Sequence, residues 1–127
     1  MHPDAEVRLP AETAYVAVLR VAASGIAARL DFTLDEIEDL RMAVSEACSM
    51  VLTEATPGGS MSAKFFLRPD RMEVRVSADA VDPVVPDTDG FGWQVLTTTA
   101  DAATASALPD EIAITLTIAA STTRDHA

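Results

Sequence analysis

The spacing of the apolar residues changes abruptly at Pro57-Gly58-Gly59, and this change limits the folds open to the chain. Before this point, apolar residues recur at steps of three and four, the spacing of one face of an α-helix. After it, they alternate with polar residues, the spacing of a strand with one buried face. Helices followed by strands in this order predict an α+β fold.

The helical part divides into two segments, preceded by a short strand from Glu6 to Leu9 that Pro10 closes. The first helix is predicted from Glu12 onward. Its apolar stripe consists of Val16, Leu19, Ala23, Ile26, Ala27 and Leu30. Thr33 and Glu36 form a capping box at the start of the second helix. The predicted buried face of that helix consists of Ile37, Leu40, Val44, Ala47, Cys48 and Val51.

The second half of the chain predicts a hairpin, a third helix and a last strand. The hairpin turns at Pro69-Asp70, and Gly90-Phe91-Gly92 opens the third helix after an acidic loop. The last strand runs from about Glu111 to Ala119. We therefore expect a two-layer α+β sandwich, in which a mixed, mainly antiparallel sheet carries three helices on one face. We expect residues 1–127 to form a single domain with a disordered tail at 121–127.

The charge balance excludes some partners and favours others. The chain has 20 acidic residues against 9 Lys and Arg, a net charge of -11. Such a surface repels phosphate backbones, so we expect no direct nucleic-acid binding. It attracts a basic partner, although acidity can also serve solubility alone. No apolar run reaches the roughly 18 residues of a membrane span, and a single cysteine favours a reducing compartment, so we predict a cytoplasmic protein without membrane contact.

The isolated motifs are weak when each is taken alone. Gly90 and Gly92 can let a phosphate approach a helix N-terminus, but taken alone they are better explained by a simple loop-to-helix turn. Glu46 in the second helix has no partner at a diagnostic spacing, and Phe91 and Trp93 suit either a partner surface or the core. Cys48 falls on the predicted buried face and is interpreted as a core residue. No metal-binding motif is present, so no metal is predicted.

Longer stretches carry a family resemblance. The segment LPAETAYVAVLRVAASGIAARLDFTLDEIEDLRMAVSEACSMV, residues 9–51, resembles the first half of RsbW-type anti-sigma factors, the serine kinases of the GHKL fold. The resemblance resumes at Arg71-Met72-Glu73-Val74, at DGFGWQVLTTTAD and at residues 112–117, and the F-G-W-Q-V-L wording is closer to an actinobacterial branch. It implies the ATP-binding domain of histidine kinases. It also implies a homodimer that holds a sigma factor until an anti-anti-sigma factor with a STAS domain releases it.

The resemblance also implies where the nucleotide site of the family would lie. Glu46 matches the glutamate that orients the chemistry, and Gly90 and Gly92 match the second glycine box. Arg20 matches an interface arginine that contacts the sigma factor and its antagonist. Met50 stands where the family has the asparagine that binds magnesium, and a thioether is a poor ligand for that cation.

Four further positions depart from the family pattern. Ala78 and Ala80 stand for the adenine-binding aspartate and the first-box glycine. Asp79 lies one residue along and could substitute only through a bulge, because its side chain otherwise points to the opposite face. The lid shrinks to residues 82–89, and Glu111-Ile112-Ala113 replaces Gly-x-Thr, so both functional residues of that motif are gone. Losing such hydrogen bonds together costs several kcal/mol, or about a thousandfold in affinity. No cofactor is therefore predicted: ATP binds weakly if at all, and magnesium is not expected.

Three functions follow from these observations. The first is an anti-sigma factor that sequesters a stress- or development-type sigma factor with little or no kinase activity. The alternative is an active ATP-dependent serine kinase that phosphorylates the STAS-domain antagonist through Glu46. The third is an acidic adaptor for another signalling protein.

Overall fold

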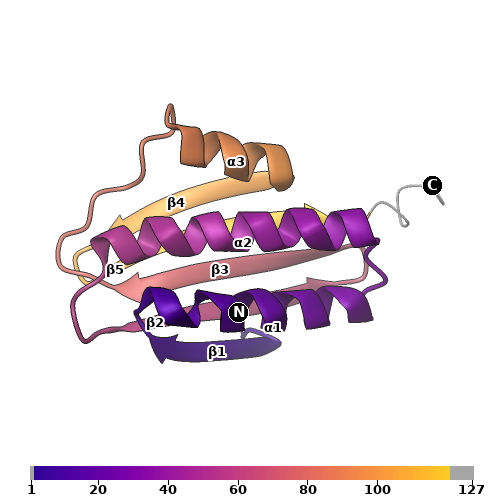
Figure 1. The fold of residues 1–127 in the computed structure, drawn as a ribbon, viewed down its shortest axis with the longest axis horizontal. Helices are drawn as coiled ribbons and strands as arrows, with labels where there is room; N and C mark the ends of the chain where they lie inside the picture. The colour runs from indigo at the N-terminus through magenta and orange to yellow at the C-terminus, as the bar shows by residue number, and fades with distance from the viewer. Residues whose placement is uncertain (1, 121–127) are drawn as a thin grey trace.

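Helices and strands lie in two layers in the computed structural model, which describes residues 2–120 (Figure 1). In chain order the elements are β1 (Ala5–Pro10), the 3-10 turn η1 (Thr13–Tyr15), α1 (Val16–Arg29), α2 (Leu34–Glu54), β2 (Ser60–Arg68), β3 (Arg71–Asp79), α3 (Phe91–Thr99), β4 (Ala102–Leu108) and β5 (Glu111–Ala119). The three α-helices cover one face of the sheet, with α2 in the middle. The predicted α+β sandwich is confirmed, and the tail predicted at 121–127 lies outside the described residues.

The sheet has five strands in the order β1-β2-β3-β5-β4. The sequence predicted a mixed, mainly antiparallel sheet, and in the structure every neighbouring pair of strands is antiparallel. β3 lies at the centre, where Val76 pairs with Ala63 of β2 and with Ile114 of β5. Because side chains alternate across a strand, these residues face the helices, and their sequence neighbours point to the other face.

β4 is the one strand that the sequence pattern did not predict. It pairs only with β5 within the described residues and forms an edge of the sheet. Its sequence, AATASAL, alternates alanine with threonine and serine, so the two faces differ little in hydrophobicity. Pairing with the apolar strand β5 supplies what the local pattern lacks.

The core lies between the helices and the inner face of the sheet. Its largest fully buried side chains include Leu19 of α1, Leu40 of α2, Leu96 of α3 and Phe65 of β2. Each fully buried side chain of this size stabilises the fold by about 1.5–3 kcal/mol. The core therefore fixes α2 against both of the other helices and the sheet.

The beginning and the end of α2 follow the sequence signals. The Glu36 backbone N–H donates to Thr33 Oγ1 at 3.1 Å, and the Thr33 backbone N–H donates to Glu36 Oε1 at 2.7 Å. This reciprocal pair is the predicted capping box. Gly58 in the turn after α2 has a φ of 80°, a conformation that favours glycine.

No helix within residues 2–120 is long and apolar enough to cross a membrane.

Candidate functional site

Glu46 and Gly92, two of the residues singled out in the sequence, come together where α2 meets α3. A Cβ atom placed on Gly92 would overlap Glu46 Oε1 and would lie 2.9 Å from Met50 Cε. Glycine at position 92 therefore lets the Glu46 carboxylate and the Met50 methyl group approach the backbone of α3. The sequence spacing alone could not predict this contact, because residues 46 and 92 are far apart in the chain.

The start of α3 gives this contact an electrostatic setting. Gly90 is the N-cap residue and has no side chain to satisfy the first N–H groups of the helix. The N-terminus of a helix carries a partial positive charge that favours an anion. The Glu46 carboxylate lies beside this end, so an acidic side chain of the chain itself occupies the space in front of Gly92.

Asp79 does not join this group of residues. The Ser60 backbone N–H donates to Asp79 Oδ2 at 2.8 Å, and Gly59 packs against the same side chain. Asp79 is exposed, whereas its neighbour Ala78 is 2% exposed and faces the helices. The carboxylate of Asp79 therefore holds the start of β2 on the opposite side of the strand from Ala78.

The other departures from the family pattern lie at two places. Ala80 is buried and forms an isolated bridge with Ala55 at the end of α2. Glu111 forms an ion pair with Arg75, and Ala113 pairs with Ser77 across β3 and β5. These last residues lie on the sheet face without helices, so their side chains point away from Glu46.

The shortened loop passes the C-terminal end of α2. The Val84 backbone N–H donates to Glu54 Oε1 at 2.8 Å. A shallow cavity of about 200 Å³ lies between this loop and Met50. The exposed carboxylates of Asp82, Asp87 and Asp89 make the loop an acidic rim.

The residues around Glu46 do not fit a magnesium–nucleotide complex. Met50 presents a thioether where a hard cation needs oxygen ligands. Ala78 and Ala80 have no polar side-chain atom for an adenine base, and both are packed in the core. Within residues 2–120, no three His, Cys, Asp or Glu side chains are grouped so that they could hold a metal ion.

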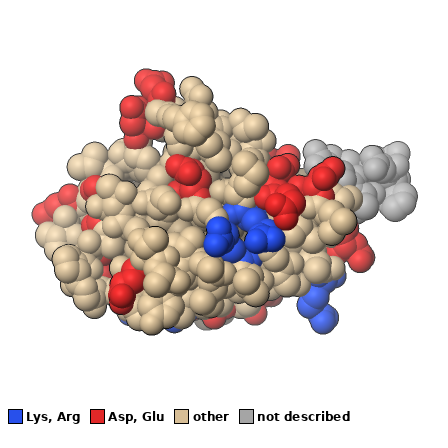
Figure 2. Space-filling view, viewed as in Figure 1, with Lys and Arg blue, Asp and Glu red and all other residues tan. Residues whose placement is uncertain are grey.

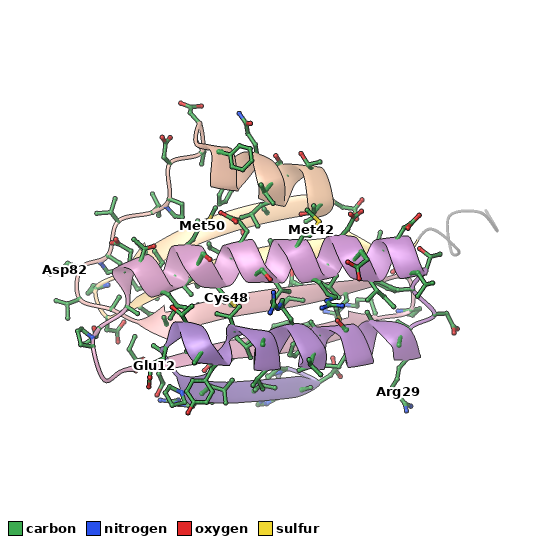
Figure 3. The ribbon with its side chains drawn as sticks, in the orientation of Figure 1. Glu12, Arg29, Met42, Cys48, Met50 and Asp82 are labelled. Carbon is green, nitrogen blue, oxygen red and sulfur yellow. The ribbon has the colours of Figure 1, made fainter. Side chains whose placement is uncertain are left out.

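Arg20 lies in a groove that also reaches Glu46. Its Nη1 donates to Ser45 Oγ at 3.4 Å, which holds the guanidinium of α1 over α2. The groove has a volume of about 510 Å³, and its lining includes Arg20, Glu38, Arg41, Met42, Glu46 and Phe91. Figure 3 shows Met42 and Met50 along the edge of α2 that faces α3.

Sequence reasoning missed Arg41 and Met42 and left Phe91 undecided. Phe91 is 80% exposed, so it belongs to the surface, whereas Trp93 packs partly against the core. The signal for the α2 residues is their spacing, since positions 38, 41, 42, 45 and 46 fall on one side of a helix. That side is polar apart from Met42, so it resembled an ordinary solvated face.

Cys48 is fully buried, as its place on the apolar stripe predicted. Burial raises the pKa of its thiol from 9.0 to about 12, and the positive charge of Arg20 offsets part of this rise. The thiol is therefore protonated near neutral pH and has little nucleophilic character.

Comparisons with known proteins identify the family of the chain. Residues 9–118 match the family model of the histidine kinase-like ATPase domain. The chain is 47% identical over 73 residues to the serine-protein kinase RsbW of Halalkalibacterium halodurans. This aligned segment covers 57% of the present chain and 45% of that kinase. It is 43% identical over 75 residues to the serine-protein kinase RsbW of Bacillus subtilis, and this segment covers 57% of the present chain and 47% of that kinase. The matched segments thus span about half the length of these relatives.

Proposed function

The chain belongs to the histidine kinase-like ATPase domain family, and from this premise we propose that it is an anti-sigma factor acting by sequestration. It holds a stress- or development-type sigma factor and has little or no kinase activity. A STAS-domain anti-anti-sigma factor releases the sigma factor, and the chain works as a homodimer.

One observation carries the proposal: the interface arginine keeps an open groove, whereas the positions for adenine and magnesium have lost the side chains that a nucleotide needs. Arg20 is held by Ser45 in an open groove, available to a partner. The nucleotide positions, in contrast, are filled by Met50, Ala78 and Ala80, which do not fit magnesium or adenine. Sequestration needs only the surface, so it survives the loss of the nucleotide site.

The charge of the chain supports the same partner class. A net charge of -11 favours a partner with basic surfaces. A protein that binds DNA and RNA polymerase carries such surfaces, because it must approach phosphate groups. An acidic binder can cover them without contacting nucleic acid itself.

The direct test is binding of a sigma factor from the same organism to the full chain. We expect a stable complex in calorimetry and inhibition of transcription that depends on that sigma factor. Arg20→Ala should weaken the complex at least about tenfold, because arginine is frequent among interface residues with large effects. Arg29→Ala is the matched control, since Arg29 lies in the last turn of α1 and points away from α2 (Figure 3). If none of the organism's sigma factors binds, the proposal is wrong.

The kinase alternative has one observation in its favour, the contact of Glu46 with Gly92. Calorimetry with Mg-ATP separates the two functions. We expect no binding heat at about millimolar nucleotide, as the several kcal/mol lost at the site require. Micromolar binding that Glu46→Ala abolishes, together with phosphate transfer to a STAS-domain protein, would establish the kinase instead.

A further inference from the structure

The two edges of the sheet differ in how they are protected against pairing with a further strand. An edge strand presents a row of backbone N–H and C=O groups, and natural proteins protect such edges with charged side chains or proline. The exposed residues of the edge strand β1 are Glu6, Arg8 and Pro10, which supply both kinds of protection. β4 at the other edge has the sequence AATASAL, with neither a charged residue nor a proline. Its sequence therefore leaves this edge open to a further strand.

The helix on the same side of the molecule is uncharged as well. α3 lies at the end of the helical layer, on the side where β4 ends the sheet (Figure 1). Its sequence FGWQVLTTT has no acidic or basic residue, and Gln94 and Thr97 are exposed. Figure 2 shows a surface over α3 that is free of acidic and basic side chains, with acidic side chains beyond both ends of the helix. We call α3 and β4 together the neutral edge.

The neutral edge is unusual for a chain of this composition. Charged residues make up 23% of the chain, and the net charge is -11. Two copies of such a protein repel each other over most of their surfaces, and like charges opposite each other in paired strands are destabilising. The neutral edge is a surface where two copies can approach without this repulsion.

The sequence of β4 is complementary to itself in one antiparallel register. When a two-fold axis passes through Ala105, Thr104 of each copy lies opposite Ser106 of the other. Hydroxyl side chains in such a pair can hydrogen-bond across the strands, and the remaining pairs of the strand join apolar residues only. Asp101, just before the strand, lies opposite Pro109 and not opposite another acid. This register therefore uses the whole strand and places no like charges opposite each other.

We propose that a second copy of this chain pairs its β4 with β4 of the first in this register. The two sheets then form one continuous antiparallel sheet, and the two α3 helices lie next to each other on the same face. Backbone hydrogen bonds supply the affinity, and the hydroxyl pairs fix the register. This inference rests on the homodimer of the proposed function, for which it names the surface. α1, which carries Arg20, lies at the opposite end of the helical layer and stays free in both copies (Figure 1).

The first experiment measures self-association of the full chain by analytical ultracentrifugation over a series of concentrations. We expect a dimer for the wild type. Thr104→Lys combined with Ser106→Lys should raise its dissociation constant at least about tenfold, because lysines then face lysines across the two-fold axis. Both residues are exposed on the sheet face without helices, so lysine is compatible with the fold there. Urea unfolding of the variant checks that the fold persists.

A matched control separates the position of the new charges from their amount. Glu12→Lys changes the net charge by the same amount as the two lysines in β4. Glu12 is exposed near the start of α1, far from β4 in the sheet order, and its side chain makes no capping hydrogen bond (Figure 3). We expect this variant to dimerise as the wild type does. An equal effect of both variants would mean that total charge alone sets the association, which overturns the inference.

The second experiment tests the register by pairing opposite charges. Thr104→Glu combined with Ser106→Glu should weaken self-association as the lysine variant does. An equimolar mixture of the two variants should form a heterodimer with at least the stability of the wild-type dimer, because each lysine now faces a glutamate. Native mass spectrometry distinguishes the heterodimer from both homodimers. A mixture without preference for the heterodimer would show that β4 does not face β4.

Amide hydrogen exchange tests whether the contact is strand pairing. Every second backbone N–H of an edge strand points away from its neighbour in the sheet. In β4 we expect these amides to exchange more slowly as the protein concentration rises through the dissociation constant of the dimer. Slow exchange that is the same at every concentration would mean that another segment of the same chain covers β4, which overturns the inference.

The outcomes separate this inference from the proposed function. If the wild type is a dimer that the β4 variants leave unchanged, the dimer uses another surface: the inference is wrong, and sequestration, measured by sigma-factor binding, stands. If the wild type is a monomer at every concentration, the inference and the proposed homodimer are both wrong. If the β4 variants dissociate the dimer and no sigma factor binds, the inference stands and the proposed function is wrong.

Discussion

Among single residues, the glycines of this chain differ sharply in what surrounds them. Gly92 has Glu46 and Met50 against it, whereas a Cβ on Gly25 would have nothing within 4 Å. Both atoms nearest to Gly92 are ends of flexible side chains, so a larger residue there would displace Glu46 rather than the helix. Gly92 thus positions the carboxylate, and Gly25 only weakens a helix.

Two glycine substitutions with opposite effects test this distinction. Gly25→Ala should raise the free energy of unfolding by about 0.5–1 kcal/mol, because alanine favours the interior of α1 and meets no neighbour there. Gly58→Ala should lower it by about 1–2 kcal/mol, because its φ of 80° is unfavourable for a residue with a Cβ. Urea denaturation of both variants measures these changes. Destabilisation by Gly25→Ala would contradict the open space at that position.

Because of Cys48, we expect the fold to lose stability at alkaline pH. Burial raises the pKa of its thiol to about 12 in the folded state, against 9.0 in an exposed chain. The folded state therefore holds this proton more tightly than the unfolded state. The proton's contribution to the free energy of unfolding is complete below about pH 9 and is lost as the pH rises toward about 12. Between about pH 8 and about pH 10 the free energy of unfolding falls by about 1.4 kcal/mol through this group.

Cys48→Ala isolates this effect from other groups that titrate. The variant is less stable at neutral pH because it leaves a small cavity in the core. The stability gap between wild type and variant should narrow by about 1.4 kcal/mol between about pH 8 and about pH 10. Parallel stability curves over this range would show that the thiol proton does not contribute.

The site residues could be predicted from the sequence only in part. The resemblance pointed to Glu46, Gly90, Gly92 and Arg20, and the structure brings Glu46 against Gly92 and into the groove of Arg20. Asp79 could be placed on the face opposite to Ala78 from its position in the strand, because one residue along a strand reverses the face, but its hydrogen-bond partner could not be predicted. The hydrogen bond that its carboxylate accepts from the Ser60 amide forms only when β3 pairs with β2, because the two residues are 19 positions apart in the chain.

At the scale of elements, α2 connects the core to the groove. It is 21 residues long and contributes six buried residues inside and the groove floor outside. Its N-terminal capping box is the strongest local signal in the sequence, which explains why its start was predicted correctly. β4 has the weakest signal, since its small residues form a strand only when β5 is beside it. Local patterns thus predict elements that stabilise themselves and miss those that a neighbour stabilises.

Removing the capping box measures how much α2 depends on it. Thr33→Ala removes the acceptor for the Glu36 amide and should lower the free energy of unfolding by about 1 kcal/mol. Thr53→Ala is the control within the same helix: its hydroxyl only donates to the Ser49 carbonyl on an exposed turn, so the change should stay within about 0.5 kcal/mol. Equal effects of the two substitutions in urea denaturation would mean that the cap does not stabilise α2.

Over the whole molecule, we expect net charge to affect how fast the partner associates and the groove beside Arg20 to affect how slowly it dissociates. The net charge of -11 acts over about a Debye length, roughly 10 Å at 0.1 M salt, whereas the contacts of Met42 and Phe91 are short-ranged. The two parts should therefore respond differently to salt. The acidic loop with Asp87 and Asp89 contributes to the long-range part without lining the groove.

Stopped-flow mixing with the sigma factor separates these contributions. Raising NaCl from about 50 mM to about 500 mM should lower the association rate constant at least about tenfold and change the dissociation rate constant much less. Asp87→Asn combined with Asp89→Asn should lower the association rate constant at low salt and reduce its salt dependence. Phe91→Ala should act in the opposite way, with faster dissociation and unchanged salt dependence. If salt acts mainly on dissociation, the acidic surface forms contacts within the complex itself, and the groove is not the principal attachment.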